Sequence, residues 1–264
     1  NVFGICDAPS GFTRQLQNLY GVQDNQISLR CYGLNHLSWF DQVKINGHDV
    51  TTDLINDPRL YQKTEMKLFE PKIAKLSKTL LLNEYLYFYY YRERALQSIL
   101  NAKQTRGESV LAINSATLEK LLTIDIDNNM EQAFHIFIDA YLTRENSYMT
   151  MEAKTERAIT RKTPTLAEFI AEPDDGGYAG VALRFINAVA TGQEIEMVLS
   201  IPNNGAIDGL LDTDIVEISC IIDKNGAHPI KIGNVPEMQM NLIRNLKFYE
   251  RSVVKAILTK NKDL

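Results

Sequence analysis

Two residues whose side chains bind transition metals follow predicted strands near the start of the chain. Cys6 ends a short apolar segment, residues 2–6, and His36 comes soon after residues 27–33, where apolar and polar side chains alternate. A thiolate and an imidazole both bind divalent transition metals, and two protein ligands leave coordination positions free for a substrate and water. From the spacing alone, a buried apolar cysteine and a structural histidine are the favoured alternative.

A tyrosine run and one arginine are the other candidates for chemistry. Tyr85 begins residues 85–91, which contain five tyrosines. A tyrosine can act as a general base, although aromatic runs more often form packing surfaces. Arg106 could hold a phosphate through two hydrogen bonds, or it could be a solvated charge at a helix end. Tyr178, beside two glycines, is a weaker candidate than Tyr85.

The first fifty residues are expected to position Cys6 and His36. They are predicted to form a strand, a turn, a helix and a second strand, at residues 2–6, 7–11, 12–19 and 27–33. Because sites in α/β sheets usually lie at the carboxyl ends of strands, this order places both residues where a site is expected.

The middle of the chain, from about residue 49 to residue 170, is predicted to be helical. Apolar residues recur there at helical spacing, most clearly in residues 65–80, 85–100 and 131–142. The face of the third helix that is predicted to be buried carries Ala133, Phe134, Phe137, Ile138 and Tyr141.

The last third of the chain returns to strands between two helices. A predicted helix has an inner face of Val181, Ala182, Phe185, Ile186 and Val189. Two strands follow, at residues 195–201 and 215–222, and then a last helix at residues 236–258. The predicted fold class is therefore α+β, a mixed α/β domain with strands within residues 1–50 and 193–234 and a helical middle.

The composition excludes several classes of protein. Of the 264 residues, 45% are hydrophobic and 23% are charged, as in ordinary globular proteins. A formal net charge of −5 without a basic patch argues against a nucleic-acid partner. No apolar run reaches the roughly 18 to 20 residues that cross a bilayer, so no membrane partner is expected. Three cysteines and no signal-peptide pattern predict a cytoplasmic protein without a disulfide framework.

Six short segments occur in the order in which one enzyme family has them. They are Gly4-Ile5-Cys6-Asp7-Ala8-Pro9, Gly33-Leu34-Asn35-His36-Leu37-Ser38-Trp39, Tyr85-Leu86, Thr105-Arg106-Gly107-Glu108, Asn203-Asn204-Gly205-Ala206-Ile207 and Val216-Glu217-Ile218-Ser219-Cys220. Through these segments the chain resembles the C-terminal domain of glycoside hydrolase family 4, the NAD- and manganese-dependent glycosidases that include 6-phospho-α- and 6-phospho-β-glucosidases. The resemblance implies that residues 1–264 form a single C-terminal catalytic and oligomerisation domain.

The resemblance implies a role for each candidate residue. Cys6 and His36 would bind Mn²⁺ or another divalent metal, and Asn35 would contact the sugar. Tyr85 would be the catalytic base, and Arg106 would help to hold the 6-phosphate. The loop that contains Asn203 would have a mainly structural role.

The implied reaction is an exception to hydrolysis by two carboxylates. NAD⁺ would first oxidise the sugar at C3, which allows deprotonation at C2 and elimination of the leaving group at C1. Water would then add at C1, and the redox step would run in reverse. Mn²⁺ would act as a Lewis acid at the C2 and C3 oxygens. Asp7 could be a general acid, as in phospho-α members, whereas residues 33–39 and 105–108 are more similar to the phospho-β enzymes. We predict a 6-phospho-β-glucosidase for substrates such as phosphorylated cellobiose or aryl glucosides, with a 6-phospho-α-glucosidase or a non-catalytic interaction module as alternatives.

The sequence also departs from the family pattern. No G-x-G-x-x-G loop follows a predicted strand, so no NAD⁺-binding residue is predicted in this chain. The chain opens without Met, and we expect the dinucleotide-binding Rossmann domain to precede Cys6 and to be missing here. The chain alone is therefore predicted to be inactive. The family resemblance also predicts a homodimer or a homotetramer.

Overall fold

The computed structural model describes residues 2–6, 8–81, 83–154, 163–171 and 177–263. Its contacts divide the chain into two compact units. Unit 1 comprises Asn1–Pro58, Glu70–Asn83 and Asp175–Leu264, and unit 2 comprises Arg59–Phe69 and Glu84–Asp174. That residues 1–264 form one domain stays a prediction.

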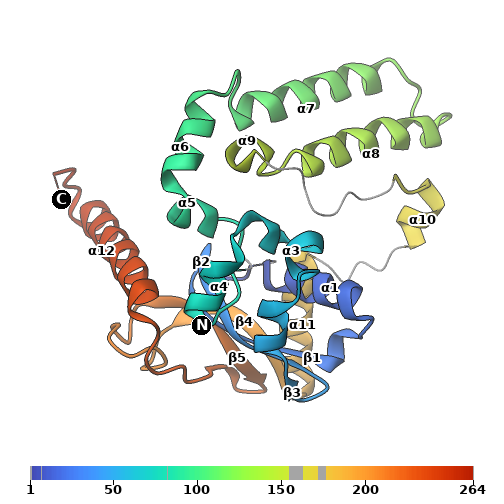
Figure 1. Cartoon of the computed structure of the whole chain (residues 1–264). Helices are drawn as coiled ribbons and strands as arrows, with labels where there is room; N and C mark the ends of the chain where they lie inside the picture. Colours follow the sequence, from blue (N-terminus) through green and yellow to red (C-terminus); the bar gives the residue numbers. More distant parts are fainter. Residues whose placement is uncertain (1, 7, 82, 155–162, 172–176, 264) are drawn as a thin grey trace. The chain divides into compact units, whose positions relative to one another are not determined.

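Unit 1 contains two antiparallel three-stranded sheets, with strand orders β1-β2-β3 and β4-β5-β6 (Figure 1). The first sheet consists of β1 (Ile27–Leu34), β2 (Leu37–Ile45) and β3 (His48–Asp49), and the second of β4 (Ile195–Pro202), β5 (Ile215–Asp223) and β6 (Gly226–Pro229). The strands predicted at residues 27–33, 195–201 and 215–222 are confirmed, and β2, β3 and β6 were not predicted.

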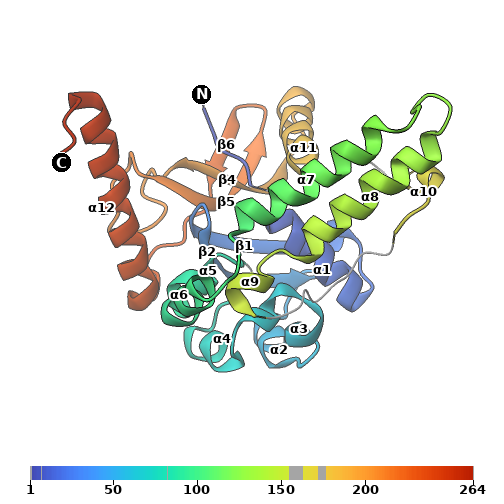
Figure 2. The same ribbon diagram turned by 90° about the horizontal axis from the view of Figure 1, so that it is seen from above.

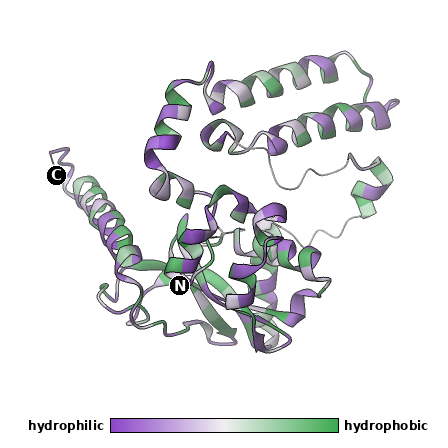
Figure 3. Ribbon diagram, in the orientation of Figure 1, coloured by the Kyte–Doolittle hydropathy of each residue, from purple (hydrophilic) through white to green (hydrophobic). Residues whose placement is uncertain are grey.

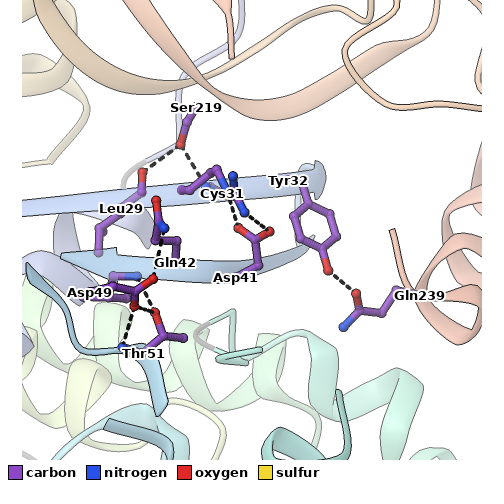
Figure 4. Close-up of polar contacts among 11 residues, drawn as sticks. Leu29, Cys31, Tyr32, Asp41, Gln42, Asp49, Thr51, Ser219 and Gln239 are labelled. Carbon is purple, nitrogen blue, oxygen red and sulfur yellow. Dashed lines mark hydrogen bonds and ion pairs between the residues drawn. The ribbon is translucent and has the colours of Figure 1, made fainter. Parts of the chain in front are cut away.

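Ser219 on β5 joins the two sheets. The strand β1 lies at the edge of the first sheet, so backbone groups on its outer side have no ladder partner within that sheet. The hydroxyl of Ser219 donates to the carbonyl of Leu29 at 2.9 Å and accepts from the amide of Cys31 at 2.8 Å (Figure 4). This side chain is fully buried, so both hydrogen bonds are shielded from water.

The described part of unit 1 also contains six helical segments. They are α1 (Ala8–Tyr20), a 3₁₀ turn at Asp24–Gln26, α2 (Thr51–Asn56), α4 (Pro71–Ser77), α11 (Gly177–Thr191) and α12 (Glu237–Thr259). The helix predicted at residues 12–19 begins four residues earlier than expected, at Ala8, where a turn was predicted. The predicted strand at residues 2–6 is a single β-bridge between Gly4 and Ser200.

The first turns of α12 are fixed to the sheets by buried polar groups. The hydroxyl of Tyr32 donates to the side-chain oxygen of Gln239 (Figure 4), and the amide of Gln239 donates to Thr79 at 3.0 Å. Further along the helix, Arg251 forms an ion pair with the buried Asp214. The predicted helix is confirmed, but green, hydrophobic residues run along its whole length (Figure 3), and several hydrophobic residues of the helix, such as Phe248 and Ile257, are exposed.

Unit 2 is helical, as predicted for the middle of the chain. It contains α3 (Leu60–Lys63), a 3₁₀ turn at Glu65–Leu68, α5 (Leu86–Tyr90), α6 (Arg92–Leu100), α7 (Arg106–Leu122), α8 (Met130–Asn146), α9 (Thr150–Ala153) and α10 (Leu166–Ala171). The helices α7 and α8 lie side by side (Figures 1 and 2). Phe134, Ile138 and Leu142 of α8 form a buried cluster.

Two predicted helices are divided, and two helix faces that were predicted to be buried are partly exposed. The helix predicted at residues 65–80 is divided, because Pro71 begins α4 after an extended Glu70. The helix predicted at residues 85–100 is divided at Tyr91. On α8, Phe137 and Tyr141 were predicted to be buried but are 47% and 37% exposed. Ile186 of α11 is 59% exposed although it was predicted to face inward.

No helix within the described ranges is long and apolar enough to cross a membrane.

Candidate functional site

A two-residue loop between β1 and β2 carries Asn35 and His36. Leu34 pairs with Leu37 across the hairpin, so the two polar residues are exposed at its tip while their neighbours are buried. His36 has φ of 63°, in the left-handed region. Gly33 has φ of 137°, and a Cβ atom at this position would lie 2.3 Å from the carbonyl oxygen of Leu37. The hairpin therefore needs glycine at position 33.

This requirement gives a stability prediction. Gly33→Ala should lower the free energy of unfolding by about 2 to 4 kcal/mol, because the new methyl group overlaps backbone atoms and the backbone conformation is strained. Gly47→Ala is the matched control: Gly47 also has positive φ, but a Cβ atom added there would meet nothing within 4 Å, so only the strain, about 1 kcal/mol, is expected. Denaturant unfolding measures both, and equal losses would show that the close approach at Gly33 is unimportant.

Cys6 reaches the same region from the N-terminal segment. Gly4 exchanges two backbone hydrogen bonds with Ser200 of β4, at 2.8 and 2.9 Å. A Cβ atom at Gly4 would lie 3.0 Å from the Cβ atom of Ser200, so this close pairing favours glycine. Since Ser200 is the cross-strand partner of Glu217 on β5, the pairing places the N-terminal segment beside that part of the sheet. Cys6 is 4% exposed and contributes to the wall of a cleft of 390 Å³ between α1, α11, β1 and β4.

The carboxylate of Glu217 is where these residues meet. It accepts hydrogen bonds from the amide of Asn35 at 3.0 Å and from the hydroxyl of Ser38 at 2.7 Å. The side chain of Cys6 also hydrogen-bonds to Glu217, and His36 interacts with it electrostatically. Burial raises the pKa of Glu217, while these hydrogen bonds and His36 act in the opposite direction. Cys6, Asn35 and His36 are therefore brought together around one buried carboxylate.

The donor set at this place fits a divalent transition metal. The thiol of Cys6 hydrogen-bonds to Glu217, and the charge of His36 acts on the same carboxylate, so both residues lie in its neighbourhood. Among the described residues, no group of three or more His, Cys, Asp or Glu side chains could hold a metal ion. A metal held by Cys6 and His36 would have two ligands from these residues, which leaves positions for oxygen ligands.

Tyr85 lies in unit 2 and is partly buried. Its hydroxyl accepts a hydrogen bond from the hydroxyl of Tyr148, and the two rings meet edge to face with centroids 6.3 Å apart. Burial, the hydrogen bond to Tyr85 and the charge of Glu84 raise the pKa of Tyr148 far above its ordinary value. Tyr148 therefore keeps its proton and remains the donor to the oxygen of Tyr85.

Arg106 is held beside the same tyrosine. Its guanidinium donates to the hydroxyl of Ser147 at 2.5 Å and to the carbonyl of Arg144 at 2.9 Å, and it lies 5.8 Å from the ring centroid of Tyr148. The neighbouring Thr105 and Glu108 form a capping box at the start of α7. The first and last residues of the Thr105-Arg106-Gly107-Glu108 segment thus have a structural function, and Arg106 begins the helix that they cap.

Three candidate residues from the sequence remain: Asp7, Tyr178 and Asn203. Asp7 lies outside the described residues. Tyr178 is 55% exposed on α11. Asn203 is fully buried and makes two hydrogen bonds with the backbone of Ile207, at 2.8 and 3.1 Å, which agrees with a structural role.

Sequence reasoning missed two residues of these groups. Glu217 was quoted only as part of a family segment, although an acidic residue between the apolar Val216 and Ile218 is unusual in a buried strand. Tyr148 has no comparable signal, because nothing in its local pattern indicates a contact with a residue 63 positions earlier.

Comparison with known proteins supplies a family match. The sequence model of the family 4 glycosyl hydrolase C-terminal domain matches residues 31–264. A 6-phospho-beta-glucosidase of Thermotoga maritima is 24% identical over 261 residues, which cover 99% of this chain and 53% of that protein. A maltose-6'-phosphate glucosidase of Bacillus subtilis is 24% identical over 270 residues, which cover 97% of this chain and 52% of that protein. The chain thus spans about half the length of the curated relatives it matches.

Solved structures show the same fold. The 6-phospho-beta glucosidase from Thermotoga maritima, with manganese, NAD⁺ and glucose-6-phosphate, matches with a TM-score of 0.70 and 21% identity, over 99% of this chain and 53% of that chain. A 6-phospho-alpha-glucosidase from gut microorganisms, in complex with NAD and Mn²⁺, matches with a TM-score of 0.62 and 19% identity, over 96% of this chain and 52% of that chain. The prediction of a mixed α/β fold is confirmed.

Proposed function

The chain belongs to the family 4 glycosyl hydrolases through their C-terminal domain, and on this premise we propose that it supplies the sugar and metal site of a 6-phospho-glucosidase. The observation that carries the proposal is the meeting of Cys6, Asn35 and His36 around the Glu217 carboxylate. Relatives named as 6-phospho-glucosidases of both anomeric types support the substrate class.

The cofactors follow from the same premise. We propose that Mn²⁺, or another divalent metal, is held by Cys6 and His36, and that NAD⁺ is bound mainly by a domain outside this chain. The presence of manganese and NAD in solved relatives supports this proposal. When bound, NAD⁺ supplies a hydride acceptor and the metal supplies a Lewis acid, which together make the C2 proton of the sugar removable.

The chain's own residues then perform three tasks. Asn35, whose amide is held by Glu217 at the tip of the hairpin, orients the sugar hydroxyls. Tyr85, once its own hydroxyl proton has passed to solvent, removes the C2 proton with its phenolate oxygen, toward which Tyr148 donates a hydrogen bond. Arg106, fixed by Ser147 and the carbonyl of Arg144, keeps further guanidinium donors for the 6-phosphate. These roles of Asn35, Tyr85 and Arg106 require no pair of catalytic carboxylates.

We propose the β-anomer as substrate, with the α-anomer as the alternative that Asp7 favours. Asp7 lies outside the described residues, so the preference rests on the segments at residues 33–39 and 105–108. A cytoplasmic location, a homodimer or homotetramer and inactivity of this chain alone stay predictions.

The proposed function is tested by the release of nitrophenol. The complete reading frame that contains this chain is assayed with the α- and β-anomers of nitrophenyl glucoside 6-phosphate, and with the unphosphorylated glucosides, with and without NAD⁺ and Mn²⁺. Turnover of the phosphorylated β-anomer that needs both additives is expected. Turnover of the α-anomer alone would support the alternative, and no turnover of any substrate by folded protein would contradict the proposal.

The phosphate contact gives a second prediction. Arg106→Lys should raise KM for nitrophenyl glucoside 6-phosphate by about 10- to 100-fold with a smaller change in kcat, because lysine cannot hold a phosphate through two parallel hydrogen bonds. Arg144→Lys is the control, because the exposed Arg144 contributes only its backbone carbonyl to this group. Initial-rate kinetics measure both variants. An unchanged KM in Arg106→Lys would exclude Arg106 from phosphate binding.

A further inference from the structure

Glu217 occupies an unusual place in the fold. It lies in the middle of β5 and is 1% exposed, and its neighbours Val216 and Ile218 are fully buried apolar residues. Its side chain is on the same side of the strand as that of Ser219, which joins β5 to β1. A buried carboxylate is costly unless it is well compensated, and an apolar residue of similar size would often stabilise a sheet equally well. The sheet itself therefore gives no reason for an acid at position 217.

The partners of Glu217 come from separate segments of unit 1. Asn35 and Ser38 belong to the β1–β2 hairpin, and Cys6 belongs to the N-terminal segment that pairs with β4. The two carboxylate oxygens divide the hairpin contacts, because Oε2 accepts from Asn35 and Oε1 accepts from Ser38. The amide of Asn83 also points to the Ser38 hydroxyl, at 3.5 Å, so the Ser38 contact is supported from a further segment.

The hydrogen bond from Asn35 to Glu217 is not needed to satisfy the polar group of Asn35. Ser38 is 2% exposed and would need a hydrogen-bond partner in any case, whereas Asn35 is exposed and could be satisfied by water. A buried acid that holds an exposed amide fixes the orientation of that amide at the tip of the hairpin. The same acid holds the Cys6 thiol, so one group sets the positions of two residues that the proposed function uses.

We propose that Glu217 is a positioning residue that fixes Asn35 for the sugar and Cys6 for the metal. This inference rests on the proposed function and adds to it a residue that touches neither substrate nor cofactor. Carboxylates that orient metal ligands in this way typically change metal affinity by about 10- to 100-fold when they are replaced.

The test compares metal binding in three variants of the complete reading frame. Glu217→Gln keeps the size of the side chain but replaces one acceptor oxygen by a donor. Glu217→Asp keeps the carboxylate and withdraws it by one methylene group. Asp214→Asn is the matched control, because Asp214 is also a buried acid of unit 1 (6% exposed) but binds Arg251 of α12. Mn²⁺ affinity is measured by electron paramagnetic resonance, and Co²⁺–thiolate absorption reports whether Cys6 binds the metal.

Glu217→Gln is expected to weaken Mn²⁺ binding by about 10- to 100-fold and to reduce the Co²⁺–thiolate band. Glu217→Asp should lie between this variant and the unaltered protein, and Asp214→Asn should lose stability without losing Mn²⁺ affinity. If Glu217→Gln does not fold, the Mn²⁺ affinity of Glu217→Asp is the test. A loss of affinity of about tenfold in that variant supports the inference.

Two results would overturn the inference, and they are distinguishable. If the unaltered protein binds Mn²⁺ and hydrolyses phosphoglucosides, but folded Glu217 variants bind Mn²⁺ equally tightly, Glu217 has only a structural role and the proposed function stands. If the unaltered protein itself neither binds Mn²⁺ nor turns over a phosphoglucoside, the proposed function fails and the inference fails with it.

Discussion

Tyr85→Phe is expected to lower kcat for nitrophenyl glucoside 6-phosphate by about 10²- to 10⁴-fold, the range typical of a lost general base. The substitution removes one hydroxyl oxygen and keeps the ring, which packs against Phe88 and Tyr148. Because Cys6 and His36 are untouched, Mn²⁺ affinity should not change. Steady-state kinetics and a Mn²⁺ titration on the same preparation measure the two quantities.

Two control variants separate base catalysis from packing. Tyr178→Phe removes the hydroxyl of an exposed tyrosine and should leave kcat unchanged. Tyr148→Phe removes the donor to Tyr85 and should lower kcat by less than Tyr85→Phe does, because the base itself remains. With substrate deuterated at C2, the residual activity of Tyr85→Phe should show a larger kinetic isotope effect than that of the unaltered protein. A kcat within about threefold of the unaltered protein would exclude Tyr85 as the base.

The second large effect is expected at the proposed metal ligands. Cys6→Ser and His36→Asn should each weaken Mn²⁺ binding by more than about 100-fold, which exceeds the usual effect of replacing a residue that only supports a ligand. A serine keeps a donor for Glu217, and asparagine tolerates the left-handed backbone of His36, so both variants should fold. Activity should fall with Mn²⁺ affinity and should return in part at high Mn²⁺ concentration.

His48→Asn is the control for the histidine variant. His48 is exposed on the short strand β3, so its replacement should change neither Mn²⁺ affinity nor activity. Full Mn²⁺ affinity in both Cys6→Ser and His36→Asn would contradict the proposed metal site, even if the protein proved to be a glycosidase.

Local sequence patterns predicted three of the strands. The alternation of Ile27, Leu29 and Cys31 with polar neighbours in the sequence identified β1, although its burial does not alternate: the first four residues are partly buried and Cys31 to Leu34 are buried. By contrast, β2 begins with four consecutive buried residues, Leu37 to Phe40, so it lacks the alternation that marks a half-buried strand. At residues 65–80 the helical spacing of apolar residues predicted one continuous helix. Pro71 interrupts it, because a proline favours the start of a helix over its interior.

The candidate site was only partly predictable, because its organisation depends on long-range contacts. Cys6, Asn35 and His36 could be selected from residue type and family resemblance, but the group that brings them together could not. Glu217 is 182 residues from Asn35 along the chain. Its role appears only when β5 lies beside β1, an arrangement for which no local propensity codes.

The central claim is that the protein cleaves phosphoglucosides by removing the C2 proton of the sugar. The most direct test is to run the reaction of the complete reading frame in D₂O and to measure the deuterium content at C2 of the glucose 6-phosphate released. Deuterium at C2 is expected, because the proton that Tyr85 removes is replaced from the solvent. Turnover that leaves C2 fully protonated would show direct displacement at C1 and would rule out deprotonation at C2.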